Sequence, residues 1–562
     1  MDDLGAGTLY KFRLNGRRDR TFPDPASRYQ PFGVHGPSQV VDPSRFAWTD
    51  HGWRTPSLDH LVLYELHVGT FSAEGTFAGV EARLPYLADL GVTAIELMPV
   101  ADFAGERNWG YDGVALFAPA RCYGTPDDLR SLVNAAHAHG LAVFLDVVYN
   151  HFGPDGAYVN AVSAHYLTDA HQSPWGRGIN LDGPYAAPVR RFFIENALHW
   201  VNEYHVDGLR LDATHALIDD SPRHFLAELT GTVRAHSRRP VCFIAEDHRN
   251  LNTLIRPVGA GGCGIDAVWA DDFHHQVRVH TAGDRDGYYA DFSGRSTDIA
   301  TTIEQGWFFT GQPSTFLGYR RGTDPMPLQP PQFVICIQNH DQIGNRADGA
   351  RLHHEIDLAT YRALSTLLLL APQTPLLFMG QEWAAGSPFL FFTDFDAELG
   401  QQVTMGRRKE FESFAAFADD RTREAIPDPQ ARETFHRSRL DWGELHTPSH
   451  AAMHRLYTRL LRLRRDTEEL RQRGRDSYAV CALDEATIAL DYANGAMRIV
   501  ARLGGTGTTD LSSDVARSGT VCLTTEDADV TEAPRPIVVE DAGRILRVHF
   551  DRPGAIVWRA TS

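Results

Sequence analysis

The chain has 562 residues and carries 72 acidic against 54 basic side chains, a formal net charge of -18 at pH 7. A chain of this length exceeds one ordinary hydrophobic core, so we expect two or three domains, one of them large enough to be a barrel. Because the acidic balance opposes contact with phosphate backbones and anionic lipids, neither nucleic acid nor a membrane is an expected partner.

The targeting and redox signals favour a cytoplasmic protein. The sequence has no run of about 18 apolar residues, and its first residues, MDDLGAGTLY, lack the basic and apolar regions of a signal peptide. Its six cysteines are scattered singly, without CxxC pairs or zinc-ligand spacing. We expect them to be buried, reduced thiols in a cytoplasmic protein.

Residues 1–52 are rich in proline, glycine and short polar turns, and include the stretch PDPASRYQPFGVHGPSQVVDP. This pattern predicts the remnant of an N-terminal β-domain whose first strands are missing or very short. We therefore expect a domain boundary near residue 52.

From residue 61 onward, short β-branched runs alternate with helical patterns, as in parallel βαβ units. The predicted strands are 61–66, 92–100, 141–148, 207–212, 241–246, 265–270, 333–338 and 375–380. Amphipathic helices lie between several of them, such as 125–140, with Thr125 as its cap, Pro126 in its first position and Gly140 at its end. Eight such units within residues 53–472 predict a (β/α)8 TIM barrel with long loops after the third and sixth strands.

A helix predicted over 453–470 closes the barrel pattern. After it, segments such as RIVARL and RILRVHF alternate with Gly, Asp and Thr turns, which predicts an antiparallel β-domain over 473–562. The expected fold class is therefore α/β, a TIM barrel flanked by a partial N-terminal β-domain and a C-terminal β-domain.

Charged side chains gather where the predicted strands end. In parallel barrels this C-terminal face carries the reactive groups, because the βα loops form a cup there over a packed interior. The candidates are Asp146, Asn150 and His151 after the third strand, Arg210 and Asp212 on the fourth, Glu246 on the fifth, and His340 and Asp341 after the seventh. Carboxylates from three strands can supply the nucleophile, the acid/base and a substrate ligand of a glycoside hydrolase.

Each candidate also has a structural interpretation. Asp146, Asn150 or Asp212 can cap the following helix. His151 and His340 can be core residues or metal ligands, and Arg210 with Asp212 can form a plain salt bridge. However, strand alternation puts Arg210 and Asp212 on one face, where the cation keeps the carboxylate ionised as a nucleophile requires. The structural interpretations need separate coincidences at equivalent strand ends, so we favour the catalytic one.

Four segments, DVVYNH, GLRLDATHA, IAEDH and QNHD, follow one another at these strand ends. Together they resemble the sequence signatures of the α-amylase superfamily of retaining α-glucan enzymes. By this resemblance Asp212 matches the nucleophile, Glu246 the acid/base, and Asp341 the aspartate that stabilises the transition state. The residues matching substrate-binding positions are Tyr111, His151, Arg210, His215 and His340.

Longer blocks outside these signatures, such as WGYDGVALFAPARCYGTPDDL and PLLFMGQEWAAGSPFLFFTDF, resemble the maltooligosyltrehalose trehalohydrolase family. The resemblance implies hydrolysis of the α-1,4 bond that joins a maltooligosaccharide to a terminal trehalose, with water as the second reactant and trehalose as a product. A glucan branching enzyme or an α-amylase is the alternative activity, and a non-catalytic glucan-binding protein is the alternative of another class. Only the last part of the family's N-terminal β-sandwich is recognisable.

Selectivity for trehalose must arise beyond the acid/base, where the leaving sugar lies. The loop after the sixth strand and the end of the eighth offer aromatic and polar groups for this acceptor side. The predicted acceptor-side residues are Trp269, Asp271, Asp272, His274, His275, Glu382 and Trp383. A helix cap is the alternative role of Asp271 or Asp272. Gln381 stands where the family pattern has an acidic residue, and we expect it to alter one acceptor-side contact.

No cofactor is predicted, because the pocket supplies its own acid, base and nucleophile. Some amylases hold structural calcium near the DVVYNH segment, but this sequence has no dense carboxylate loop that demands it. We therefore predict no metal ligands, and expect exhaustive chelation to leave the activity nearly unchanged.

Overall fold

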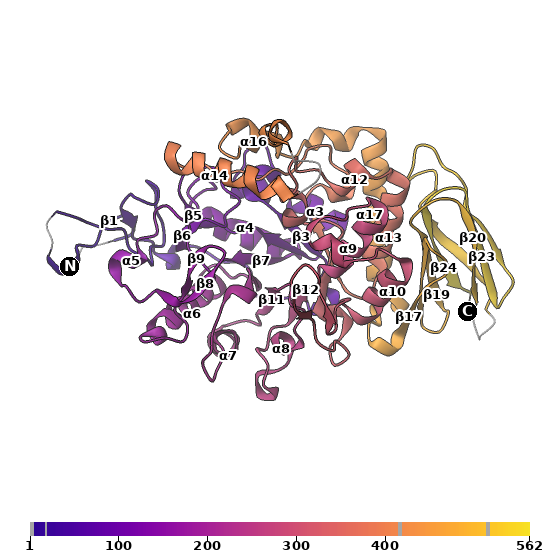
Figure 1. Ribbon diagram of the computed structural model, residues 1–562, viewed down its shortest axis with the longest axis horizontal. Coiled ribbons are helices and arrows are strands. Elements are labelled where there is room, and N and C mark those ends of the chain that lie inside the picture. The colour runs from indigo at the N-terminus through magenta and orange to yellow at the C-terminus, as the bar shows by residue number, and fades with distance from the viewer. Residues whose placement is uncertain (1–4, 17–18, 414–418, 513–516, 562) are drawn as a thin grey trace.

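The computed structural model describes residues 5–16, 19–413, 419–512 and 517–561. A closed barrel of parallel strands forms its centre, and an antiparallel β-domain lies at the end opposite to the N-terminus (Figure 1). Residues 1–4, 17 and 18 of the predicted N-terminal segment, and 513–516 and 562 of the predicted C-terminal domain, lie outside the described residues.

The eight barrel strands follow the order β10-β11-β12-β15-β16-β3-β4-β7 around the barrel. Their bounds are Leu63–Leu66 (β3), Ala94–Leu97 (β4), Ala142–Val147 (β7), Gly208–Leu211 (β10), Cys242–Glu246 (β11), Ala267–Trp269 (β12), Phe333–Ile335 (β15) and Thr374–Phe378 (β16). All the predicted strands are confirmed, but each is shorter than predicted. Apolar composition does not reveal where pairing starts and stops. Only 61–66 and 241–246 end where the observed strands end, and the other predicted ranges run on into the βα loops.

The barrel interior is a packed core. Strands such as β7 are buried along their whole length, as expected of a parallel sheet covered by helices. A Cβ atom at Gly208 would lie 2.2 Å from the ring of Phe144, so this position in β10 requires glycine. The interior cluster consists of Leu61, Leu63, Ala94, Ala142, Phe144, Ile244, Ala267, Trp269, Val334, Cys336 and Leu376.

Helices surround the barrel (Figure 1). Among them are Leu84–Leu90 (α3), Pro126–Ala138 (α4), Ala186–Glu203 (α6), Phe225–His236 (α7), Ser296–Gln305 (α10), Leu358–Leu370 (α13) and Pro448–Asp466 (α17). The predicted start of α4 is confirmed, with a capping box between Thr125 and Asp128. The last predicted helix begins earlier, because Pro448 suits a first turn, and it ends at Asp466, where Thr467 turns to extended backbone.

Long segments are inserted after the third and sixth strands, as predicted. The first contains Val159–Val162 (α5) and a hairpin of Leu167–Ser173 (β8) and Gly176–Ile179 (β9). The second contains Asp272–Thr281 (α9), the 3-10 turn Gly287–Asp291 (η6), and the short strands Gln312–Pro313 (β13) and Arg320–Arg321 (β14). The antiparallel pair Ala101–Phe103 (β5) and Gly113–Pro119 (β6), after the second strand, was not predicted.

The C-terminal sheets confirm the predicted antiparallel domain. Their strands are Tyr478–Ala482 (β17), Thr487–Tyr492 (β18), Met497–Arg502 (β19), Gly507–Ser512 (β20), Gly519–Thr524 (β21), Val538–Asp541 (β22), Ile545–Phe550 (β23) and Gly554–Ala560 (β24). A buried ion pair between Arg362 on α13 and Glu526, 2.8 Å long, ties this domain to the barrel.

The N-terminal segment is held to the barrel by charge. Its strands Leu9–Tyr10 (β1) and Ser38–Gln39 (β2) pair with each other. Further on, the buried carboxylate of Asp50 lies 2.8 Å from His137, 2.9 Å from His205 and 2.7 Å from Arg239. The domain boundaries at residues 52 and 472 stay predictions.

The six cysteines are free. The expectation that all of them are buried is wrong, since only Cys336 is fully buried and both Cys481 and Cys522 are exposed. The exposed pair lies on β17 and β21, the outer strands of the five-stranded sheet, where side chains can face solvent. Among the helices built from described residues, none has the length and apolar character needed to cross a membrane.

Candidate active site

The charged residues predicted from the strand ends meet on neighbouring strands of the barrel. Arg210 on β10 pairs in register with Asp146 on β7, and Glu246 ends the adjacent strand β11. Asp212 is the first residue after β10. The parallel pairing therefore brings these side chains to one level near the C-terminal end of the barrel.

Arg210 is the centre of this cluster. Its Nη1 lies 2.6 Å from Asp212 Oδ1 and 2.9 Å from Asp146 Oδ2, and its Nη2 lies 3.9 Å from Glu246 Oε2. The guanidinium is fully buried and packs 4.3 Å from the ring centre of Trp269. The predicted shared face of Arg210 and Asp212 is confirmed.

The carboxylate of Asp212 is held by two donors. Oδ1 accepts a hydrogen bond from Arg210, and Oδ2 accepts one of 2.7 Å from Asn150 Nδ2. Only 8% of the residue is exposed. These bonds fix the orientation of a carboxylate that still has a path to solvent.

The carboxyl group of Glu246 lies in a different electrostatic environment from that of Asp212. Burial raises the pKa of its carboxyl group well above the usual range, and the charges of Asp212 and Asp341 add to this effect against the opposing charge of Arg210. Its Oε2 accepts a hydrogen bond of 2.6 Å from the backbone N–H of Ala213. A carboxyl group that keeps its proton at neutral pH can act as a general acid.

The backbone turn that donates a hydrogen bond to Glu246 is strained. Ala213 has a φ of 40°, in the left-handed region that non-glycine residues rarely adopt. Such a conformation costs about 1–2 kcal/mol. The turn places the Ala213 N–H against Glu246 directly after Asp212, so the strain is located where the two carboxyl groups are positioned.

His340, the first residue of α11 (His340–Gly344), is bonded through both ring nitrogens. Nδ1 contacts Glu65 Oε1, and Nε2 lies 2.7 Å from the hydroxyl of Tyr111, which donates a 2.5 Å hydrogen bond to Asp146. Since the hydroxyl proton goes to Asp146, both nitrogens of His340 act as donors. Burial opposes this charge, but the carboxylates of Asp341 and Glu65 outweigh it and raise the pKa of His340 to about 9.

Asp341 is the most open of the three predicted catalytic carboxylates. Its side chain is 40% exposed and lies 3.5 Å from His340 Nε2. Its Oδ1 accepts a hydrogen bond from Asn345 Nδ2 at 3.2 Å. Asp271 lies close enough that Asp341 contributes, after burial, to raising the pKa of Asp271 to about 6.

The structure also places the predicted residues His151 and His215 beside the cluster. His151 Nε2 lies 2.9 Å from the backbone oxygen of Tyr111, and its ring stacks on Trp175 at the tip of the β8–β9 hairpin. His215 lies in the 3-10 turn Thr214–Ala216 (η4) and packs edge-on against His248, with ring centres 4.4 Å apart.

Several predicted acceptor-side residues are buried in the protein, and their acceptor-side roles stay predictions. Trp269 is 3% exposed inside the barrel, and its ring packs on Arg210. Trp383, with no exposed surface, contacts Trp442 instead of solvent. His274 and His275 are buried on α9, and burial lowers the pKa of His275 to about 3.

Asp272, Glu382 and Gln381 are bonded to protein groups, and their acceptor-side roles also stay predictions. Asp272 bonds to Asn250 Nδ2 at 2.8 Å and to Arg321 at 2.7 Å. Glu382, in the 3-10 turn Gln381–Trp383 (η8), accepts hydrogen bonds of 2.9 Å from two tyrosine hydroxyls, and Gln381 binds Tyr457 and the Phe378 N–H. None of the three is exposed, so each stabilises the surrounding loops.

Two buried carboxyl groups near the site were not predicted. Glu65 on β3 binds the N–H and the imidazole of His340. Glu96 lies opposite Glu65 on β4, and neither of its carboxyl oxygens has a hydrogen-bond partner within the described part of the chain. Burial raises the pKa of Glu96 well above the usual range. The available signal was an acidic residue inside each of the apolar runs LVLYEL and VTAIELMPV.

The chain resembles known proteins over most of its length. Residues 40–175 match the family model described as "Alpha amylase, catalytic domain". The chain is similar to the malto-oligosyltrehalose trehalohydrolase of Deinococcus radiodurans, with 48% identity over 84% of this chain and 77% of that protein. The corresponding protein of Rhizobium sp. is 41% identical over 93% of this chain and 87% of its own length.

A solved structure shares the fold over the full length. The crystal structure of a protein named as an alpha amylase of Salmonella typhimurium superposes with a TM-score of 0.87 at 38% identity, covering 99% of this chain and 91% of that one. By contrast, the 1,4-alpha-glucan branching enzyme of Mycobacterium tuberculosis matches 50% of this chain and 43% of its own length, at 32% identity.

Proposed function

The chain belongs to the malto-oligosyltrehalose trehalohydrolase family of α-amylase-type glycoside hydrolases, and we propose that it hydrolyses the α-1,4 bond next to the terminal trehalose of maltooligosyltrehalose. The products are trehalose and a maltooligosaccharide, and water is the second reactant. The observation that carries the proposal is the arrangement of Asp212 and Glu246 about the buried Arg210, with the pKa of Glu246 raised by burial.

In the proposed mechanism Asp212 attacks the anomeric carbon while Glu246 protonates the departing glycosidic oxygen. Glu246 then takes a proton from water, whose oxygen displaces Asp212 with net retention at the anomeric carbon. Retention requires carboxyl groups about 5–5.5 Å apart. The contacts of Arg210 with both groups are compatible with this separation.

We assign Asp341 to the binding of sugar hydroxyls, which it holds more tightly in the oxocarbenium-like transition state than in the ground state. Its exposed carboxylate supports this role. Tyr111, His151 and protonated His340 are assigned to the sugar bound on the donor side, where Tyr111 supplies an aromatic face.

Product analysis tests the function. Incubation with maltotriosyltrehalose should give trehalose and maltotriose, whereas maltopentaose should be cleaved slowly. An α-amylase would cleave maltopentaose and amylose at least as well, and a branching enzyme would change amylose without releasing trehalose. Binding of glucan without any turnover would establish the non-catalytic alternative.

For the acceptor side we also propose a cavity lined in part by Asn345, the residue that donates a hydrogen bond to Asp341. Its volume is about 320 Å³, and its lining includes Tyr288, Gln342 and Asn345. Tyr288 lies in η6, is 36% exposed, and its hydroxyl is 3.4 Å from Gln342 Oε1. This ring offers a stacking face to a leaving trehalose, and Gln342 and Asn345 offer polar partners.

Replacing Tyr288 by alanine should therefore lower kcat/KM on maltotriosyltrehalose by about tenfold more than on maltopentaose. The reason is that only the leaving trehalose is expected to stack on this ring. The matched control is Tyr288→Phe, which retains the ring and should keep most of the selectivity. Both rates are measured by chromatography of the products. Equal losses on the two substrates would show that Tyr288 supports the fold or the general pocket and not the choice of acceptor.

We also propose a cytoplasmic location. It is supported by the six cysteines, which are all free, including the two exposed ones on the C-terminal sheet.

A further inference from the structure

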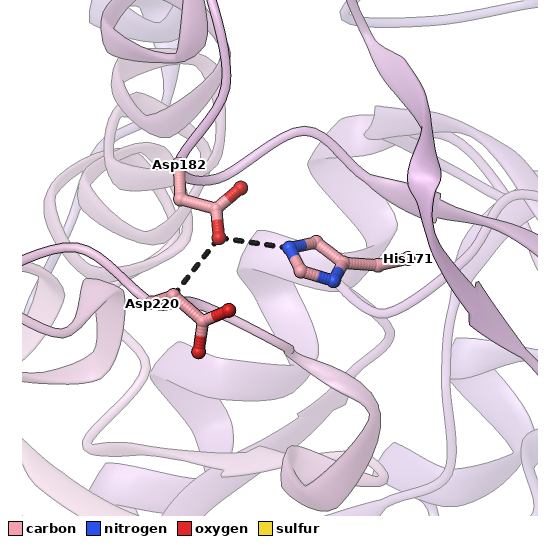
Figure 2. A group of neighbouring side chains, drawn as sticks. All are labelled: His171, Asp182 and Asp220. Carbon is pink, nitrogen blue, oxygen red and sulfur yellow. Dashed lines mark hydrogen bonds and ion pairs between the residues drawn. The ribbon is translucent and has the colours of Figure 1, made fainter.

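Three side chains of the metal-ligand type meet at the base of the β8–β9 hairpin, outside the cluster around Arg210 (Figure 2). His171 lies on β8, Asp182 follows β9, and Asp220 belongs to the loop after β10. Their ligand atoms all lie within 4.8 Å of one another. Segments far apart in the sequence thus bring one imidazole and two carboxyl groups together.

A β-bulge aims His171 at this point. The register of the hairpin runs from Thr168 opposite Gly178 directly to Gln172 opposite Arg177, so residues 169–171 have no partner in the ladder. A Cβ atom on Gly178 would lie 3.1 Å from that of His171, so the glycine allows the bulged strand to approach closely. Bulges commonly redirect a side chain in this way.

Each of the two carboxyl groups sits on a braced segment. Beside Asp182, the buried Asn180 bonds to the backbone oxygens of His165 and Pro184 and to the N–H of Gly183 at 2.9–3.0 Å. Beside Asp220, the carboxylate of Asp219 forms a 2.9 Å ion pair with Arg190 and accepts the N–H of Phe225. The backbone that carries these two carboxyl groups is therefore held in place before any ion binds.

The hydrogen bonds within the group do not use all of its potential ligand atoms. Asp182 Oδ2 accepts hydrogen bonds from His171 Nε2 at 2.8 Å and from the Asp220 N–H at 2.9 Å, which Figure 2 shows as dashed lines. The exposed carboxyl group of Asp220 has no recorded partner within the described residues, and His171 and Asp182 are 15% and 12% exposed.

We propose that His171, Asp182 and Asp220 bind a divalent transition-metal ion of the zinc class. One imidazole nitrogen and two carboxylate oxygens suit zinc, with water completing the coordination, whereas calcium and magnesium prefer oxygen ligands alone. The partial exposure of the group gives the ion a path from solvent. This site is not predicted by the sequence, because its ligands have no common spacing.

The ion would join the inserted hairpin to the β10–α7 loop. The tip of that hairpin carries Trp175, whose ring stacks on His151 with centroids 4.7 Å apart and planes inclined by 5°. A hairpin held in place by the ion would therefore also hold Trp175 in place beside the catalytic cluster. We expect bound zinc to raise the melting temperature and to lower KM, while kcat stays unchanged because no ligand touches the reacting atoms.

The test uses the full chain after exhaustive chelation, titrated with zinc in a calorimeter, with bound metal counted by elemental analysis. The wild type should bind one equivalent that His171→Ala and Asp220→Ala each bind at least about tenfold more weakly. The matched control is His165→Ala, which removes a neighbouring histidine of the same inserted segment and should bind as the wild type does. Melting temperatures should rise with zinc only in the proteins that bind it.

Other results would overturn the assignment. One is a wild type that binds no zinc, and another is a His171→Ala variant with unchanged stoichiometry and affinity. Calcium that displaces zinc at equal concentration would show that the ligands are oxygens only. Asp220 is exposed, so Asp220→Ala should remain folded by circular dichroism and keep the test decisive even where His171→Ala does not fold.

Discussion

Replacing Asp212 by asparagine should lower kcat on maltotriosyltrehalose by at least about 10³-fold without unfolding the protein. The amide has nearly the shape of the carboxylate and can still accept the bond from Arg210, but it cannot attack the anomeric carbon. Arg210 also keeps its 2.9 Å ion pair with Asp146, so the cluster stays paired. Release of trehalose gives the rate, and thermal unfolding reports the fold.

The matched control is Asp169→Asn, which removes one negative charge from an exposed ion pair with Arg177 on the β8–β9 hairpin. Its activity should equal that of the wild type. An Asp212→Asn enzyme that retains a tenth of normal activity would end the assignment of Asp212 as the nucleophile.

Periodic features of the fold could be read from the sequence. The eight barrel strands were recognisable because each is an apolar run between helical patterns, and a parallel sheet covered by helices needs such runs. The same alternation placed Arg210 and Asp212 on one face, which their 2.6 Å contact confirms. Strand geometry alone therefore located the core of the candidate site.

Loop conformation could not be read in this way. Asp271 and Asp272 are adjacent in the sequence, yet Asp272 turns into the protein to bind Arg321 while Asp271 stays partly exposed near Asp341. Which of the two aspartates turns inward depends on the position of residues 308–309, because the backbone N–H groups of these residues also donate hydrogen bonds to Asp272. Such contacts come from distant segments, and no local pattern records them.

The two central carboxyl groups differ because of their surroundings. Asp212 accepts bonds from Arg210 and Asn150, whereas Glu246 accepts one backbone N–H, and burial keeps its proton on. One barrel end can therefore hold a nucleophile fixed by two donors next to a carboxyl group whose raised pKa suits a general acid. The pH dependence of kcat/KM should follow: because the acid form of Glu246 is required, the rate should fall as pH rises through the raised pKa of this group.

Replacing Glu246 by glutamine should remove that alkaline limb and lower kcat/KM on maltotriosyltrehalose by about 10²–10⁴-fold, since the amide cannot protonate the leaving oxygen. With α-maltosyl fluoride, the first step should survive, because fluoride departs without protonation as Asp212 forms the ester bond. Hydrolysis of that ester still needs a base, so turnover should stay slow until azide is added. Azide needs no deprotonation, and its attack should release Asp212 and give α-maltosyl azide, detectable by mass spectrometry and NMR. A Glu246→Gln enzyme that loses activity equally on both substrates and is not rescued by azide would show that Glu246 supports the pocket and is not its acid/base.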